Sequence, residues 1–331
     1  AETRKIYAAM KDYVNRGIFR TVEDSFVYVE RTLPSGAVRR GLVGKLDLEC
    51  YDWAPGSATP VRATEGTVES RLPARVEVRR GATLEMPHIM VFIDDPENAV
   101  IPSAAGGEAL YDFELMLGGG HIRGSRVTGE AAERLTAALE APEGSVRFAI
   151  GDGNHSLAAA KRCWEQIKRN LPESELETHP ARYALAEIVN IHDEAVTFEP
   201  IHRVLLETVP RGFIEEAAAR LPRGKGQAVT LLAGRREMEI ETGMPLGALA
   251  ALVDELLGDW RREHGGEPDY IHGDEEARAL GDKPSSVGVL LPRLEKAELF
   301  PHITEHGPYP KKSFSIGHAR DKRYYLECRA I

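Results

Sequence analysis

A short run of glycine, acidic, amide, imidazole and hydroxyl side chains, Gly151 to Ser156, holds the densest set of chemically useful groups in the chain. It lies between an apolar segment, residues 146–150, and an alanine-rich segment, residues 157–168. We therefore predict a strand, a tight turn and a helix. The first N–H groups of a helix have no intrahelical acceptor, and the helix dipole favours negative charge there. The turn predicts an anion-binding site, such as a cradle for phosphate.

Each side chain of this turn has an expected role. Asp152 could hold a metal ion or accept a proton, and His155 could bind phosphate or shuttle a proton. Close approach of the backbone to a ligand and further polar contacts are expected from Gly151, Gly153, Asn154 and Ser156. The alternative is structural, with an amide or hydroxyl side chain capping the helix and the glycines serving the turn. The leading apolar strand and the density of polar groups favour a site.

A second segment, residues 62–71, combines two acids, two arginines and two threonines. Arginine forks match the geometry of phosphate and carboxylate, so Arg62 or Arg71 beside Glu65 suits an anionic substrate. Glu65 and Glu69 would share a face if the segment were helical. The alternative is an exposed helix start stabilised by ion pairs.

Further cationic groups could meet a phosphate. His202 and Arg203 form a compact pair after Pro200, with a surface loop as the alternative. Five Lys or Arg residues lie between positions 311 and 323 of an otherwise acidic chain. Such a run is usually a solvated tail. Because apolar residues interleave with these cations and a strand is expected next, a folded anion-binding lip is the second reading.

The bulk composition narrows the class of protein. With 331 residues, 42% of them hydrophobic and 28% charged, the chain can build one large or two ordinary domains. A net charge of −10 and the lack of a long basic run argue against a nucleic-acid or membrane-surface partner. No apolar run reaches the roughly 18 residues of a membrane span. Three scattered cysteines fit a reducing cytoplasm, and the start without Met suggests that a native segment precedes residue 1.

Hydrophobic periodicity and turn residues predict the remaining elements. Residues 62–80 are expected to be partly helical and broken by Pro73. Helices are predicted over residues 2–16, 129–140, 211–221, 246–264 and 294–305. Strands are predicted over residues 25–33, 40–49, 87–95, 109–117, 121–127, 183–191, 228–233, 236–241, 286–291 and 324–329. The mixture lacks a regular βαβ alternation, which favours an α+β fold, and residues 192–225 are the expected seam.

Taken together, the motifs resemble the bacterial family described as domain of unknown function 1015. The resemblance covers essentially the whole chain and implies no established activity. Members usually carry a further N-terminal segment. The motifs that carry the resemblance are GDGNHSLAAAK (151–161), RATEGT (62–67), KKSFSIG (311–317), LEMPHIM (84–90), FEPIHR (198–203) and KRYYLE (322–327).

The Asp-Gly-Asn-His-Ser turn is also similar to the Asp-Gly-His-His-Arg-like turn of the ADP-dependent serine kinases of the ParB/sulfiredoxin superfamily. This resemblance implies that the turn grips nucleotide phosphates and that Glu65 activates a serine hydroxyl. Ala63 and Thr64 replace the residues expected before that glutamate. Ser156 stands where an arginine is usual, so its phosphate contact would fall to another cation: Lys161, Arg203 or Lys312.

The resulting expectation is a ParB/sulfiredoxin-like catalytic region over residues 1–195 and a family-specific α/β region over residues 196–331 that adds the basic lip. The protein would be a cytoplasmic phosphotransferase that uses ADP or ATP with Mg²⁺ and acts on a small hydroxyl substrate such as serine. Glu65 would be the general base and Asp152 would hold Mg²⁺, while Asn154 and His155 neutralise the transferred group. The alternatives are a phosphoserine phosphatase and a non-catalytic sensor of a nucleotide or phosphoamino acid.

Overall fold

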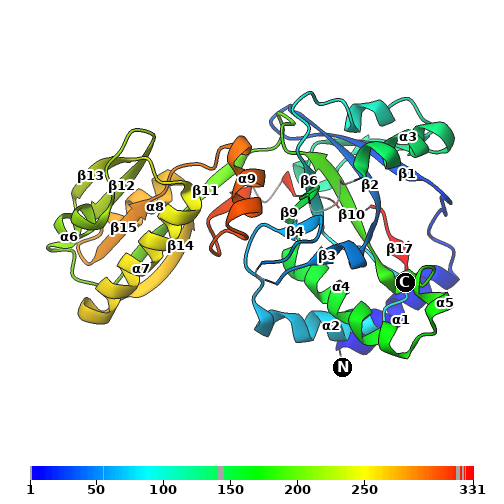
Figure 1. The fold of residues 1–331 in the computed structure, drawn as a ribbon, viewed down its shortest axis with the longest axis horizontal. Coiled ribbons are helices and arrows are strands. Elements are labelled where there is room, and N and C mark those ends of the chain that lie inside the picture. The colour runs from blue at the N-terminus through cyan, green and yellow to red at the C-terminus, as the bar shows by residue number, and fades with distance from the viewer. Residues whose placement is uncertain (1, 55, 141–144, 318–320, 323, 325) are drawn as a thin grey trace. The chain divides into compact units, whose positions relative to one another are not determined.

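The computed structural model describes residues 2–54, 56–140, 145–317, 321–322, 324 and 326–331 (Figure 1). The chain divides into two compact units. The first unit comprises residues 1–196, 303–308 and 319–331, and the second comprises residues 197–302 and 309–318. The chain thus leaves the first unit after Val196 and later contributes its C-terminal end to that unit.

The first unit is built on a nine-stranded mixed sheet in the order β3-β4-β9-β6-β10-β2-β1-β8-β7. The pairs β3/β4, β4/β9 and β6/β10 are parallel, and the other neighbours are antiparallel. A separate antiparallel pair joins β5 to β17. The strands are β1 (Phe26–Thr32), β2 (Val38–Asp47), β3 (Tyr51–Asp52), β4 (Val61–Ala63), β5 (Leu84–Glu85), β6 (Met90–Ile93), β7 (Ala109–Glu114), β8 (His121–Val127), β9 (Phe148–Asp152), β10 (Tyr183–Asn190) and β17 (Arg329–Ala330).

Helices of the first unit cover one face of this sheet. Small side chains at Ala158, Ala159 and Ala160 let α4 pack closely on apolar residues of β6, β9 and β10. Farther along the same face, Leu135 and Leu139 of α3 pack with apolar residues of β1, β2 and β10. The helices that lie wholly in the first unit are α1 (Glu2–Asn15), α2 (Leu72–Arg80), α3 (Gly129–Leu139), α4 (Asn154–Ile167) and α5 (Glu173–Leu176).

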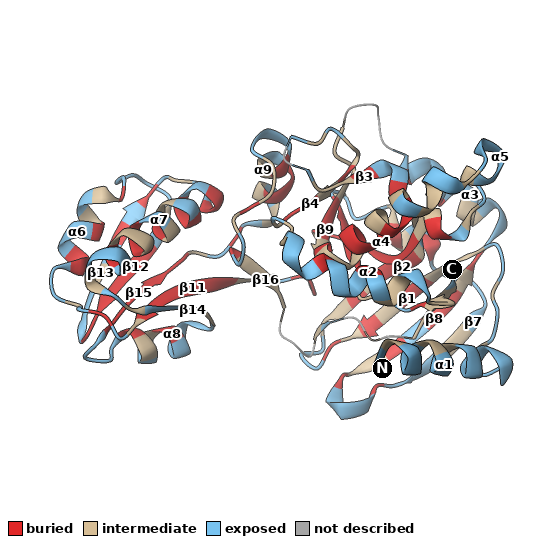
Figure 2. Ribbon diagram, turned by 90° about the horizontal axis from the view of Figure 1, so that it is seen from below, coloured by how far each residue is buried: buried red, intermediate tan, exposed pale blue. Residues whose placement is uncertain are grey.

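The C-terminal segment packs on the other side of the central strands. Tyr324 and Leu326 lie against a cluster that includes Val29, Val43 and Leu185. These β-strand residues alternate with those that face α3 and α4, as the period of two in a strand requires. Figure 2 shows the resulting run of buried residues along the strands of this sheet. Residues near the C-terminus are therefore part of the core of the first unit.

The second unit contains a six-stranded sheet in the order β13-β12-β15-β11-β14, with β16 paired to β11. Its apolar core includes Val204, Leu232, Ala277 and Leu290. Its strands are β11 (Phe198–Leu206), β12 (Gln227–Ala233), β13 (Arg236–Thr242), β14 (Glu267–His272), β15 (Ser286–Leu290) and β16 (Phe314–Ile316). Its helices are α6 (Phe213–Arg220), α7 (Leu246–His264) and α8 (Asp274–Gly281), and α9 (Leu299–Glu305) begins in it.

The structure corrects three local predictions. Pro73 does not break a helix but starts one, because it occupies the first turn of α2, where its missing N–H costs nothing. The expected loop at residues 198–203 is the buried strand β11. The strand predicted over residues 324–329 is reduced to β17, with residues 323 and 325 outside the described part. The mixed helix and strand content agrees with the expected class, and the ParB/sulfiredoxin-like core stays a prediction.

Within the described residues, no helix is long and apolar enough to cross a membrane.

Candidate active site at the start of helix α4

The sheet brings three separate stretches of sequence to one edge. Because β4 and β9 are parallel, with Ala63 opposite Ile150, the loop that carries Glu65 and the turn that starts at Asp152 leave the sheet side by side. Thr64 fixes this arrangement, since its buried hydroxyl donates to the Ile150 carbonyl over 2.6 Å. The antiparallel strand β6 begins at the same edge, with Met90 opposite Asp152.

The first turn of α4 carries no side-chain cap. Gly153 is the N-cap residue, in the left-handed region (φ 90°), and has no side chain that could cap the helix; its own N–H donates to Asp152 Oδ1 at 2.7 Å. The backbone N–H groups of Ser156 and Leu157 both donate to the Gly153 carbonyl. The structural alternative, in which Asn154 or Ser156 caps the helix, is therefore wrong for this turn. An uncapped start of a 14-residue helix favours an anion.

The two glycines approach the protein itself. A Cβ on Gly153 would lie 2.3 Å from the carbonyl oxygen of His88, and a Cβ on Gly151 would lie 2.6 Å from the ring of Phe92. These contacts explain why no larger residue fits at either position, and close approach of the glycines to a ligand stays a prediction.

Asp152 is held by a histidine and a lysine. His88 Nε2 lies 2.9 Å from Asp152 Oδ2, and Lys322 Nζ lies 3.1 Å from the same oxygen. Burial of the carboxylate acts to raise its pKa, but the hydrogen bond and charge of His88 and the charge of Lys322 outweigh burial and lower the pKa to about 2. Asp152 is therefore an anion at neutral pH and a poor proton acceptor.

His155 faces the loop that follows β4. Its Nε2 accepts a hydrogen bond from the Val68 N–H at 3.1 Å, which leaves the proton of the neutral ring on Nδ1. Burial lowers the pKa of His155; the charge of Glu65 opposes this shift, and the charges of Arg71 and Arg75 add to it. His155 is thus a neutral donor that binds the two loops together, and Glu65 lies close enough to act on it electrostatically.

Asn154 supplies an unusual buried acceptor. Its side chain is 7% exposed, and within the described structure its Oδ1 has no hydrogen-bond partner. A buried polar atom left without a partner costs about 1–3 kcal/mol. An amide in this position at the mouth of α4 is the kind of group that a polar ligand would satisfy.

The arginines predicted from residues 62–71 take different positions. The Nε of Arg62 donates to the carbonyl of Thr59 at 3.0 Å, so this side chain braces the approach to β4. Arg71 is exposed and acts on His155 only through its charge. Ser156 is half-buried in the first turn of α4. The structure therefore brings Glu65, Arg71 and the turn at residues 151–156 into one neighbourhood.

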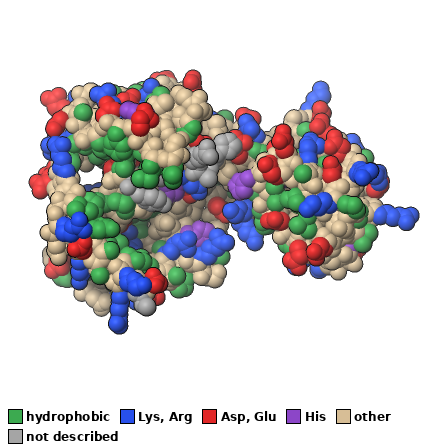
Figure 3. All heavy atoms as spheres, turned by 180° about the vertical axis from the view of Figure 1, so that it is seen from behind, with side chains coloured by type: hydrophobic (Ala, Val, Ile, Leu, Met, Phe, Trp, Pro, Cys, Tyr) green, Lys and Arg blue, Asp and Glu red, His purple; other side chains and the backbone are tan. Residues whose placement is uncertain are grey.

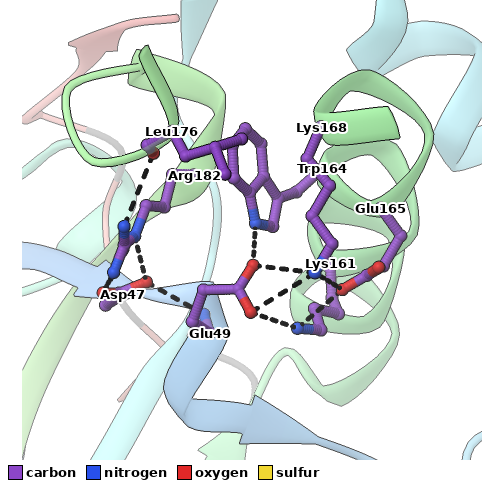
Figure 4. Close-up of polar contacts among 8 residues, drawn as sticks. All are labelled: Asp47, Glu49, Lys161, Trp164, Glu165, Lys168, Leu176 and Arg182. Atoms are coloured by element: carbon purple, nitrogen blue, oxygen red, sulfur yellow. Dashed lines mark hydrogen bonds and ion pairs between the residues drawn. The ribbon is translucent and has the colours of Figure 1, made fainter. Parts of the chain in front are cut away.

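Lys161 points into a separate ion-pair network (Figure 4). Its Nζ lies 2.9 Å from Glu165 Oε1 and 3.8 Å from Glu49 Oε2, and its side chain is 12% exposed. Lys168 and the indole N–H of Trp164 also contact Glu49. Because its charge is already matched by two carboxylates, we do not retain Lys161 as a phosphate contact.

The residues of the second unit that were predicted to contact phosphate lie on or near strand β11, where His202 and Arg203 contact protein groups. His202 is buried, with Nε2 3.0 Å from Asp274 Oδ1 and Nδ1 accepting from the Leu291 N–H, and burial lowers its pKa. Arg203 is buried as well and donates to Asp254 and to the carbonyls of residues 201, 311 and 312. Lys312 itself is exposed, with φ 61°, and contributes its carbonyl to Arg203. These contacts occupy the ring nitrogens of His202 and the guanidinium of Arg203, while a phosphate contact of Lys312 stays a prediction.

Two residues of the site escaped the sequence analysis. His88 looked like an isolated histidine, and Lys322 looked like one cation of a basic tail. Both converge on Asp152 because β6 starts beside the end of β9 and because the C-terminal segment packs in the first unit. The motifs LEMPHIM (84–90) and KRYYLE (322–327) were the available signals, since each belongs to the family pattern.

Among the described residues, no group of three or more His, Cys, Asp or Glu side chains is placed to hold a metal ion. Both oxygens of Asp152 are engaged, Oδ1 by the N–H of Gly153 and Oδ2 by His88 and Lys322.

On the face drawn in Figure 3, acidic and basic side chains occur on both units.

The fold and this turn place the protein in a class of mixed helix and sheet proteins with a candidate anion site at a helix start. The chain belongs to the family described as "Protein of unknown function (DUF1015)", whose model matches residues 1–327. A comparison with curated proteins found no match.

Solved structures to which the chain is similar include the following, all of low sequence identity. "SbnI with C-terminal truncation from Staphylococcus aureus" is 10% identical, with a TM-score of 0.47 over 86% of this chain and 85% of that one. "Free serine kinase in complex with AMP" is 13% identical, with a TM-score of 0.43 over 87% and 91%. A mutant free serine kinase in complex with ADP is 13% identical, with a TM-score of 0.46 over 90% and 94%. All three scores are below 0.5, so the proposals below depend on the site alone.

Proposed function

We propose that this protein binds a nucleotide at the turn formed by residues 151–156 and transfers a phosphoryl group to a small hydroxyl substrate such as serine. One observation carries the proposal. The parallel ends of β4 and β9 bring the loop that carries Glu65 beside the start of α4, and there the buried Oδ1 of Asn154 offers an acceptor for a donor group of the ligand, such as a hydroxyl. An anion-binding helix start beside a separate carboxylate is what a phosphotransfer site requires.

The residues divide the work between holding the phosphates and moving a proton. The backbone N–H groups of Asn154 and His155 at the start of α4, the Nδ1–H of His155 and the side-chain NH2 of Asn154 would donate to phosphate oxygens and stabilise their charge. Glu65 would take the proton of the substrate hydroxyl. The hydroxyl oxygen would attack the terminal phosphorus of the nucleotide, and the bond between that phosphorus and the bridging oxygen of the leaving nucleotide would break. Asp152 is unsuited to that role, because a carboxyl with a pKa of about 2 accepts protons poorly at neutral pH.

The donor and the metal are the finer parts of the proposal. ADP or ATP would serve as phosphoryl donor. Mg²⁺ usually binds through one or two carboxylates together with substrate phosphates, and it would neutralise charge on the transferred group. We therefore propose that Mg²⁺ arrives with the nucleotide and that Asp152 would bind it once Lys322 has left its Oδ2 for the phosphates. A binding site made of protein groups alone is not part of the proposal, since the described residues offer no carboxylate cluster.

Binding and turnover can be tested separately. Isothermal titration of the purified protein with ADP, ATP and AMP, each with and without Mg²⁺, measures nucleotide affinity. Incubation with serine and labelled nucleotide, followed by detection of phosphoserine, measures transfer. Binding together with phosphoserine formation supports the proposal. Binding without turnover would identify a sensor, and release of phosphate from phosphoserine without nucleotide would identify a phosphatase; either result overturns the proposed transfer.

The role of Glu65 has a matched control. Glu65→Gln should lower turnover by roughly 10²- to 10⁴-fold, the usual contribution of general acid–base catalysis, and should leave nucleotide affinity within about twofold. Glu69→Gln, four residues later, removes a charge that contacts Trp53 and Arg162 and should retain turnover. Undiminished turnover of Glu65→Gln would eliminate the base assignment.

A further inference from the structure

Among the described cations of the first unit, Lys322 combines a contact with the turn at residues 151–156 with an accessible ammonium group. Its side chain is 52% exposed, and its Nζ contacts Asp152 Oδ2 at 3.1 Å. Lys161, in contrast, is 12% exposed and lies between two carboxylates. A cation that reaches the turn at residues 151–156 and keeps half of its surface open can meet an incoming anion without unfolding its surroundings.

Two buried arginines hold the backbone that carries Lys322. Arg31 Nη1 donates to the Asp321 carbonyl at 3.1 Å and to the Lys322 carbonyl, and Arg39 Nη1 donates to the Asp321 carbonyl at 2.6 Å. Both arginine side chains are almost fully buried, on β1 and β2. Charge-assisted hydrogen bonds of this kind are stronger than neutral ones. The backbone at residues 321–322 is therefore anchored to the central sheet.

The residues after Lys322 are anchored as well. The hydroxyl of Tyr324 donates to the Met116 carbonyl at 2.8 Å, and the guanidinium of Arg31 lies 4.8 Å from the centre of the Tyr324 ring. Farther on, Arg329 pairs with Glu85 where β17 joins β5. The described residues around Lys322 are thus anchored to the first unit, while the side chain of Lys322 is half-exposed.

We infer that Lys322 is the cation that contacts the phosphate chain of the nucleotide, and that the C-terminal segment exists in part to deliver it. The inference rests on the proposed function of the turn at residues 151–156. On binding, the ammonium of Lys322 would exchange Asp152 for a phosphate oxygen. His88 stays bound to Asp152 Oδ2, so the carboxylate keeps a partner after the exchange. Lys322 would thus make the phosphate contact that Ser156, which stands where an arginine is usual, cannot make.

The test compares nucleotides that differ only in phosphate. Lys322→Met, Lys322→Arg and the unaltered protein are titrated with ATP, ADP, AMP and adenosine. A lost charge-assisted contact predicts that Lys322→Met weakens ADP and ATP binding by about ten- to a hundredfold and leaves adenosine affinity unchanged. Lys322→Arg should keep most of the affinity for ADP and ATP, because it keeps the positive charge. Lys11→Met, on the exposed face of α1, is the control lysine and should bind like the unaltered protein.

The outcomes separate this inference from the proposal beneath it. If the unaltered protein binds none of the nucleotides, the proposed function fails and the role of Lys322 fails with it. If it binds ADP and ATP, and Lys322→Met binds them equally well, only the role of Lys322 is overturned. An equal loss for adenosine and ADP would also overturn it, because a general distortion of the fold does not depend on phosphate. Thermal unfolding of each variant identifies such a distortion directly.

Discussion

The turn at residues 151–156 and the two residues His202 and Arg203 of strand β11 differ in what their side chains contact. Both were predicted to meet phosphate. In the turn, Asn154 has a buried oxygen without a partner, the first turn of α4 has no side-chain cap, and Asp152 pairs with a half-exposed lysine. On β11, His202 and Arg203 are at most 2% exposed and their ring nitrogens and guanidinium meet protein acceptors and donors.

The difference shows that residue type alone does not distinguish a ligand site from a structural tie. A buried cation with all its hydrogen bonds made to the protein stabilises the fold and has nothing left for a ligand. A polar group that is buried without a partner costs free energy, and a ligand can recover it. The variants below test this contrast, beginning with the largest expected effect.

Arg203→Met should cause the largest loss of stability. The change leaves Asp254 and the carbonyls of residues 201, 311 and 312 without their donor. Removal of one partner from a buried ion pair costs roughly 3–5 kcal/mol, and because the Asp254 side chain is 29% exposed we expect the lower end of that range. Urea unfolding, followed by circular dichroism, measures the change in the free energy of unfolding. Nucleotide affinity of the folded fraction should stay within about twofold.

Arg223→Met is the matched control for this variant, because Arg223 is an exposed arginine of the same unit. Its free energy of unfolding should change by less than about 0.5 kcal/mol. If Arg203→Met were as stable as the control but had lost nucleotide affinity, Arg203 would be a ligand contact, and the contrast between the two regions would disappear.

Asp152→Asn should show a smaller loss that depends on pH. The pKa of Asp152 is lowered from 3.8 to about 2 in the folded protein, a shift that corresponds to about 2 kcal/mol of stability. Since the folded pKa is the lower one, this stability is fully present above pH 4 and is lost as the pH falls toward 2. The difference in unfolding free energy between variant and unaltered protein should therefore be constant from pH 7 to about 5 and shrink below pH 4.

Urea titrations at a series of pH values measure this difference. A difference that is already absent at pH 7 would contradict the ion pairs of Asp152 with His88 and Lys322. A difference that persists undiminished near pH 2 would show that the aspartate stabilises the turn by its shape and hydrogen bonds, without need of its charge.

The sequence predicted those parts of the fold that depend on local pattern. The strands predicted over residues 25–33 and 40–49 are β1 and β2, and α7 spans the predicted residues 246–264. Strand β11 was missed because Pro200, His202 and Arg203 suggested an exposed loop. Their burial depends on Asp254 and Asp274, which lie far along the chain, and local periodicity carries no information about such partners.

In the candidate site, too, the sequence predicted the local elements but not the contacts between residues far apart along the chain. The strand, turn and helix around residues 151–156 follow from local sequence, and the structure has them. The convergence of His88 and Lys322 on Asp152 follows from the order of strands in the sheet and from the path of the C-terminal segment. Neither of these is encoded in the spacing of a few residues, so both partners were missed.

Lys161→Met should give the smallest effect and provides the sharpest test of the contrast within the first unit. Lys161 lies on the same helix as Asn154, yet its ammonium is held by Glu49 and Glu165, whose side chains are about one-third exposed. Partly exposed ion pairs contribute up to about 1 kcal/mol, so the loss of stability should stay below that value. Lys168 remains to pair with both carboxylates. ADP and ATP affinity should not change, as measured by the same titrations that compare Lys322→Met with Lys11→Met. A loss of affinity that grows with the number of phosphates would mean that Lys161 leaves its carboxylates for the ligand, and contacts in the free protein would then fail to separate binding residues from structural ones.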